Sequence, residues 1–164
     1  MKKVLKRILI ILLIIFVLIQ FIRPEKNRSD GKGPNDISTL YPVPDSVESI
    51  LKVACYDCHS NNTRYPWYAE IQPVAWWLNN HIVDGKKDLN FSEFAKYRIR
   101  KQYIKFEQII KLVKDNAMPL ASYTWIHKDA ILTPGQKQTI MAWSTSIRDS
   151  IKAHYPPDSL TRKK

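Results

Sequence analysis

The 164-residue sequence predicts an all-α domain preceded by an apolar N-terminal helix. Apolar side chains recur at helical spacing in four segments after residue 45, and little of the chain alternates as a β-strand does. Hydrophobic residues make up 45% of the chain, too many for a disordered protein, and two cysteines are too few for a disulfide framework. A packed helical core must therefore supply the stability.

The first helix is predicted within residues 1–22. Residues 8–22 are apolar apart from Gln20, and four basic residues precede them: Lys2, Lys3, Lys6 and Arg7. A helix counted from residue 4 would be about 28 Å long, close to the roughly 30 Å core of a bilayer. We expect an uncleaved single-pass transmembrane helix with its basic end in the cytoplasm. A cleavable signal peptide is the alternative, but no small-x-small site follows. Both predict export to the periplasm.

Residues 23–44 are polar and contain four prolines and two glycines, which predicts a flexible tether. We expect the domain at 45–155 and a polar tail at 156–164. The net charge is +11, and residues 1–34 hold eight basic and two acidic residues. Over half of the excess charge therefore flanks the apolar helix, so it does not indicate a nucleic-acid-binding protein.

The first two domain helices have recognisable starts. Asp45 and Glu48 have the spacing of a capping box. The buried face of that helix is predicted to contain Val47, Ile50, Leu51 and Ala54. A second helix is expected over residues 73–82, with Pro73 in its first turn.

Two further helices are predicted in the second half. Asn90 and Glu93 repeat the capping-box spacing, and a basic helix with an apolar stripe follows (Phe106, Ile109, Ile110, Val113). The last helix is expected to begin at Thr133, with Pro134 at its first position and Gln136 completing a capping box. Its buried face would contain Ile140, Trp143, Ile147 and Ile151.

The cysteines lie in the sequence Cys55-Tyr56-Asp57-Cys58-His59, the CxxCH pattern of c-type haem attachment. Two thiols one helical turn apart can each bond a haem vinyl group, and the adjacent imidazole then becomes the proximal iron ligand. Covalent haem is attached outside the cytoplasmic membrane in bacteria, which agrees with the predicted export.

Three other interpretations of the motif stay open. A thioredoxin-like redox pair needs a βαβ context, whereas the surroundings are predicted to be helical. A zinc site would use the CxxCH residues with His81 or His127, but neighbouring Cys58 and His59 cannot readily face one tetrahedral ion. A disulfide would leave His59 without a role.

Residues 53–143 resemble the bacterial CxxCH haem-binding domain family. The matching segments are CYDCHSNNTRYPWYAEIQPVAWWLNNHIVDGKKDLNFSEF and NAMPLASYTWIHKDAILTPGQKQTIMAW. The resemblance implies a compact all-α fold, similar to a class I cytochrome c, around one covalent haem. It implies haem binding without a particular reaction.

The sixth iron ligand has several candidates. Met118 lies beside Pro119 after the basic helix, and a Met-Pro pair on an ordered loop commonly supplies this ligand in the small cytochromes c that the chain resembles. His81 is the main rival because it follows Trp77 by one helical turn. His127, Met141 and His154 are weaker candidates, and a five-coordinate iron stays open.

Aromatic residues and a basic segment complete the expectations. Trp67 and Trp77 are expected to shield the haem from water. Residues 86–114 contain nine basic and three acidic residues, which indicates either a solvated helix face or a docking patch for an acidic redox partner.

The sequence thus predicts a membrane-anchored periplasmic monohaem cytochrome that transfers single electrons. The alternative is a haem-based sensor or ligand-binding module with a labile sixth ligand. A peroxidase-like enzyme would need an acid–base residue beside an open iron, for which His81 is the candidate. No other catalytic constellation is present in the sequence, which favours the electron carrier.

Overall fold

The computed structural model describes residues 1–161, and every regular element in them is a helix, which confirms the all-α prediction. In chain order these are α1 (Lys2–Ile19), η1 (Ile37–Thr39), α2 (Asp45–Ala54), α3 (Tyr56–His59), η2 (Trp67–Glu70), α4 (Val74–Asp88), η3 (Phe91–Lys96), α5 (Ile99–Lys114), α6 (Ala121–Thr124), η4 (Lys128–Ala130), α7 (Pro134–His154) and α8 (Pro157–Leu160).

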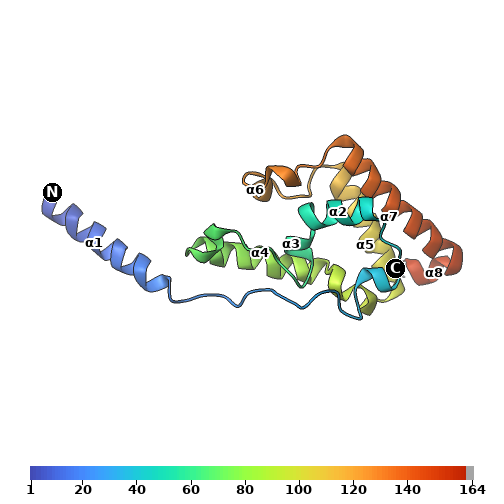
Figure 1. The fold of residues 1–164 in the computed structure, drawn as a ribbon, viewed down its shortest axis with the longest axis horizontal. Coiled ribbons are helices and arrows are strands. Elements are labelled where there is room, and N and C mark those ends of the chain that lie inside the picture. Colours follow the sequence, from blue (N-terminus) through green and yellow to red (C-terminus); the bar gives the residue numbers. More distant parts are fainter. Residues whose placement is uncertain (162–164) are drawn as a thin grey trace.

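The core lies where α5 and α7 pack against each other and α2 covers α7 (Figure 1). The apolar stripes predicted for these helices point into it, apart from Ile110, which is half-buried. Aromatic rings pack together in the core: the ring centroid of Phe106 lies 5.2 Å from that of Phe94 and 5.6 Å from that of Trp143. Helix α3 contacts both α2 and α4, so it joins the packed helices α2, α5 and α7 to α4.

Helix starts match the sequence in one case and differ in two. Thr133 and Gln136 form the predicted capping box of α7, with Pro134 in its first turn. At α2, however, Asp45 is already helical and caps nothing, so that prediction was wrong. Asn90 does cap a helix, but the helix is the 3₁₀ element η3 and not the long α5. Capping spacing alone does not reveal whether the helix beyond it is short or long.

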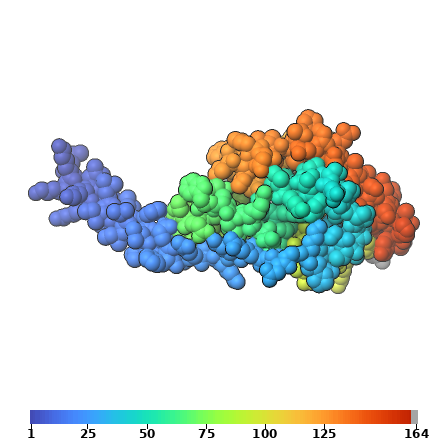
Figure 2. Space-filling model, in the orientation of Figure 1, coloured from blue at the N-terminus to red at the C-terminus, as the bar shows by residue number. Residues whose placement is uncertain are grey.

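The prediction of a transmembrane helix is not supported. Helix α1 forms within the expected residues, but within residues 1–161 no helix combines the length and the apolar character needed to cross a membrane. Basic residues occupy the first two turns of α1, so its uncharged part from Ile8 to Ile19 is only about 18 Å long at about 1.5 Å per residue. In Figures 1 and 2 the helix extends from one end of the molecule, and none of its residues is buried.

The segment 23–44 lies along the domain and is not a free tether (Figure 2). The Asn27 carbonyl accepts the Thr63 N–H at 3.0 Å, and its side chain donates to the Ser60 carbonyl at 2.9 Å. Further along, Ile37 has 0% exposure in the main core. The packed unit therefore begins before Asp45. The proline and glycine content of this segment predicted flexibility. The contacts of Asn27 and Ile37 could not be read from the sequence, because two isolated residues form no periodic pattern.

The C-terminal tail also departs from the expectation. Within residues 156–164, α8 turns back and places Leu160 in the core at 3% exposure, against α5. The part of the predicted polar tail at 162–164 lies outside the described residues.

Replacing Ile37 by Ala should destabilise the domain by about 2–5 kcal/mol, because it leaves a cavity in the core. The matched control is Leu40→Ala three residues later, where the side chain is 46% exposed and the change should be small. Urea denaturation of both variants measures the difference. Equal stability of the two variants would show that the segment does not pack as described.

Candidate functional site

The CxxCH residues form one tight turn between α2 and α4. Helix α2 ends at Ala54, and the Cys55 carbonyl then accepts the N–H groups of Cys58 and His59 at 3.3 and 3.0 Å. This turn, α3, brings both cysteines to the same side of the fold, and both are free thiols. Burial raises the pKa of Cys55 to about 12 and that of Cys58 to about 11, so both thiols stay protonated at neutral pH. A thioredoxin-like pair instead needs a lowered thiol pKa.

His59 is oriented by the backbone carbonyls of Gly85 in α4 and of Leu89, the residue that follows α4. Its Nδ1 lies 2.9 Å from the Gly85 oxygen and 3.0 Å from the Leu89 oxygen. Both partners are acceptors, so Nδ1 must carry the proton and Nε2 is left unprotonated in the neutral ring. Metal-binding histidines are held in this way, because the hydrogen bond fixes the tautomer and the ring orientation.

Gly85 makes this arrangement possible. A Cβ at this position would lie 2.6 Å from the Cys58 carbonyl oxygen and 3.1 Å from the Cys58 Cβ. Real Cβ atoms do not approach a backbone oxygen so closely, so any larger residue would push α4 away from α3. The glycine therefore sets the distance between the motif and the carbonyls that hold His59.

Two neighbouring cavities meet at the motif. The larger measures about 220 Å³ and the smaller about 60 Å³, and they share four lining residues: Cys55, His59, Asp88 and Met118. Small-molecule pockets commonly measure about 300–1,000 Å³, so the larger cavity approaches that range. The smaller extends into the apolar core between α2, α5 and α7, where Leu51, Ile109 and Ile140 line it.

The structure brings both leading candidates for the sixth iron ligand to this site. Met118 lines both cavities, and His81 lines the larger one. His81 Nδ1 lies 2.8 Å from the Trp77 carbonyl of its own helix, which leaves Nε2 without that partner. Met118 follows Asn116, whose φ of 57° reverses the chain after α5, and the Met118 N–H donates to the Leu112 carbonyl at 3.2 Å. The weaker candidates His127, Met141 and His154 line neither cavity.

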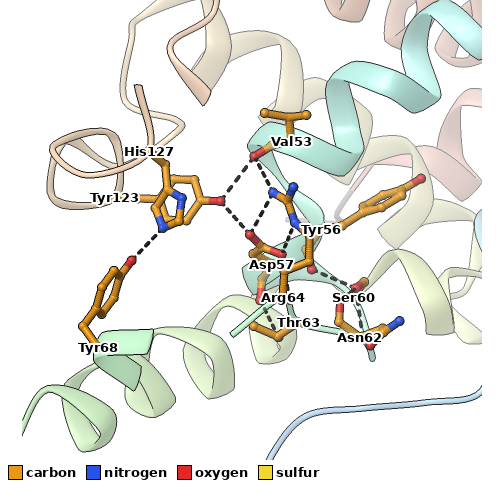
Figure 3. A network of polar contacts seen from close by, with 10 residues as sticks. All are labelled: Val53, Tyr56, Asp57, Ser60, Asn62, Thr63, Arg64, Tyr68, Tyr123 and His127. Carbon is orange, nitrogen blue, oxygen red and sulfur yellow. Dashed lines mark hydrogen bonds and ion pairs between the residues drawn. The ribbon is translucent and has the colours of Figure 1, made fainter. Parts of the chain in front are cut away.

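Asp57, the second residue between the cysteines, is the centre of a polar network (Figure 3). Its carboxylate is buried and accepts hydrogen bonds from Arg64 Nη2 at 3.1 Å and from the Tyr123 hydroxyl at 2.7 Å. Burial and the bond to Asp57 raise the pKa of Tyr123, so its hydroxyl remains a donor. Tyr123 lies five residues after Met118, so the network joins the motif to the loop that carries Met118.

The network continues to a second aromatic layer (Figure 3). The ring of His127 stacks on Tyr123 with centroids 4.3 Å apart, and its Nε2 lies 2.7 Å from the Tyr68 hydroxyl. These contacts tie η2 to the α6 segment. They also occupy His127, which was a weak candidate for the iron.

The predicted shielding tryptophans lie elsewhere. Trp67 is 77% exposed and Trp77 is 47% exposed, and neither lines the cavities. In η2 it is Tyr68, the neighbour of Trp67, that turns inward, and Trp77 packs on His81 with ring centroids 4.3 Å apart. Their apolar side chains predicted burial. In the structure, the faces of η2 and α4 on which they lie are not the faces that line the cavities.

Sequence reasoning did not identify Asp57, Gly85 or Tyr123. Gly85 lies three residues beyond the helix predicted over residues 73–82, because α4 continues to Asp88, so the sequence did not mark it as a glycine inside a helix. The other two offered no local signal, since their partners are 7 to 66 residues away in the chain.

Within residues 1–161, no group of three or more His, Cys, Asp or Glu side chains is arranged to hold a metal ion. The zinc site that combined the motif with His81 or His127 is therefore not formed.

A family described as a haem-binding domain matches residues 14–146, more than half of the chain. Comparisons with curated proteins and with solved structures gave no match.

Gly85→Ala should destabilise the protein by about 1–3 kcal/mol, because α4 must move away from α3. Gly135→Ala is the control, since a Cβ there meets nothing within 4 Å in the first turn of α7. Chemical denaturation compares the two, and nitrogen chemical shifts of the His59 ring report whether Nδ1 keeps its partners. Wild-type stability and shifts in Gly85→Ala would contradict this role.

Proposed function

Because the chain belongs to the haem-binding domain family, we propose that it is a monohaem c-type cytochrome that transfers single electrons. One observation carries the proposal: His59 is fixed through Nδ1 beside two free thiols, with its other ring nitrogen available, in the wall of an apolar cavity.

The residues present fit a covalent haem. Cys55 and Cys58 would hold it through thioether bonds, and His59 would be the proximal ligand. The two thiols and the imidazole are the groups that such a haem requires, and Cys55 and His59 line both cavities. The smaller cavity is lined mainly by apolar side chains, which suit an apolar macrocycle. When bound, the group supplies a metal centre that exchanges one electron.

The chain's own residues favour electron transfer over open-site chemistry. Met118 lines both cavities together with His59, so it is placed to close the sixth position. The Tyr123–Asp57 bond holds the loop of Met118 against the motif. A held methionine raises the reduction potential relative to a second histidine and leaves no open position for a substrate.

We extend the proposal to location and partners. The CxxCH motif supports export, because this attachment takes place outside the cytoplasmic membrane in bacteria. Helix α1 exposes apolar side chains along its length, which suits contact with lipid. Exposed basic residues at the end of α4 and on α5, including Lys87, Lys111 and Lys114, suit an acidic redox partner.

Covalent attachment is tested by producing the full chain in cells that mature c-type cytochromes, fractionating them and staining a denaturing gel for haem. We expect a stained band in the membrane fraction, and no stained band for Cys55→Ser/Cys58→Ser. Haem that leaves the wild-type chain on denaturation would contradict attachment. A stained band confined to the cytosol would contradict export.

The sixth ligand is tested by Met118→Ala with His81→Ala as its matched control from the same cavity. Met118→Ala should abolish the weak long-wavelength absorption of methionine-ligated ferric haem and lower the reduction potential, and His81→Ala should change neither. The reverse result would make His81 the ligand. Rapid, complete binding of carbon monoxide to the reduced wild type would favour the sensor instead.

A further inference from the structure

Resting on the proposed haem function, we propose that Lys105, with Gln108, forms a binding site for a carboxylate side chain of the haem, which takes the place of Asp88 on the lysine. Lys105 lies on α5 and lines the smaller cavity together with Gln108 and Asp88.

The charges around the cavities single out Lys105. Three acidic residues line the larger cavity: Asp57, Asp84 and Asp88. Among residues 1–161, Lys105 is the one lysine or arginine that lines either cavity. Haem carries a pair of carboxylates that would otherwise face acidic side chains.

Lys105 is unusually buried for a lysine, with 7% exposure. Its ammonium donates to Asp88 Oδ1 at 2.8 Å and to Gln108 Oε1 at 2.7 Å. An ammonium has three N–H donors, so one remains beyond these two bonds. A buried charge is costly unless it is paired, so when Asp88 leaves the lysine another anion must replace it, and the third donor can add a hydrogen bond to that anion.

Asp88 is suited to exchange with such an anion. Its side chain is 64% exposed, whereas that of Lys105 is 9% exposed. The carboxylate of Asp88 can therefore turn into water at little cost, while Lys105 stays in the wall. In the haem-free protein Asp88 balances the lysine, and an entering carboxylate takes over that role.

The test uses the haem-free full-length protein, titrated with ferric haemin and with haemin dimethyl ester, which lacks the free carboxylates. Absorbance and tryptophan fluorescence give both dissociation constants. We expect the ester to bind the wild type about tenfold more weakly, because a charge-assisted hydrogen bond contributes about 1.5–3 kcal/mol and about 1.4 kcal/mol is tenfold.

Lys105→Met should bind the two compounds within about a factor of two, and Lys105→Arg should restore the preference for haemin. The matched control is Lys111→Met, which removes the same charge from an exposed position on α5 and should keep the tenfold preference. Asp88→Asn should tighten haemin binding and leave ester binding unchanged, because it removes the competing carboxylate.

The outcomes separate the two proposals. Equal binding of haemin and its ester to the wild type would overturn the carboxylate site and leave the haem function intact. Retained discrimination in Lys105→Met, or its equal loss in Lys111→Met, would also overturn the site. Failure of the wild type to bind either compound would overturn the carboxylate site, and the haem stain of the denaturing gel decides the haem function separately. If Lys105→Met does not fold, the wild-type comparison and Lys105→Arg still decide.

Discussion

The hydrogen bonds from His59 Nδ1 to the Gly85 and Leu89 carbonyls are the constraint on which the site depends. They join α3 to the last turn of α4 and leave Nε2 as the available ring nitrogen. They exist because residue 85 has no Cβ, so the two helices approach to backbone contact. Without that contact the imidazole would lose its orientation, and the wall that contains Cys55 and Cys58 would lose its support from α4.

Asp57 supplies a second, separate clamp from the same short helix. Its buried carboxylate is satisfied by Arg64 and Tyr123, which makes its burial tolerable and ties the motif to the segment after Met118. The carbonyls of Gly85 and Leu89 orient His59, and Tyr123 connects Asp57 to the segment after Met118. A four-residue helix therefore organises both candidate axial ligands.

The positive charge of the chain has several separate roles. Part of it lies at the start of α1, and part is exposed on α5. Other basic side chains form contacts within the fold. Arg64 forms an ion pair with Asp57, Lys86 donates a hydrogen bond to Asn27 of the N-terminal segment, and Lys105 lines the cavity and pairs with Asp88. The surface available to an acidic partner is therefore less basic than the sequence of residues 86–114 indicates, and one of its lysines belongs to the cavity.

The sequence by itself determined the all-α class, the faces of α5 and α7, the capping box at Thr133 and the CxxCH motif, because each depends on residues within one or two helical turns. Only the tertiary structure decided the packing of Ile37 and Leu160, the exposure of Trp67 and Trp77, and the roles of Asp57, Gly85 and Lys105. These features depend on partners that folding brings together from distant segments, or on which face a helix turns towards its neighbour. The structure also ends α1 at Ile19, and within residues 1–161 no helix is long and apolar enough to cross a membrane.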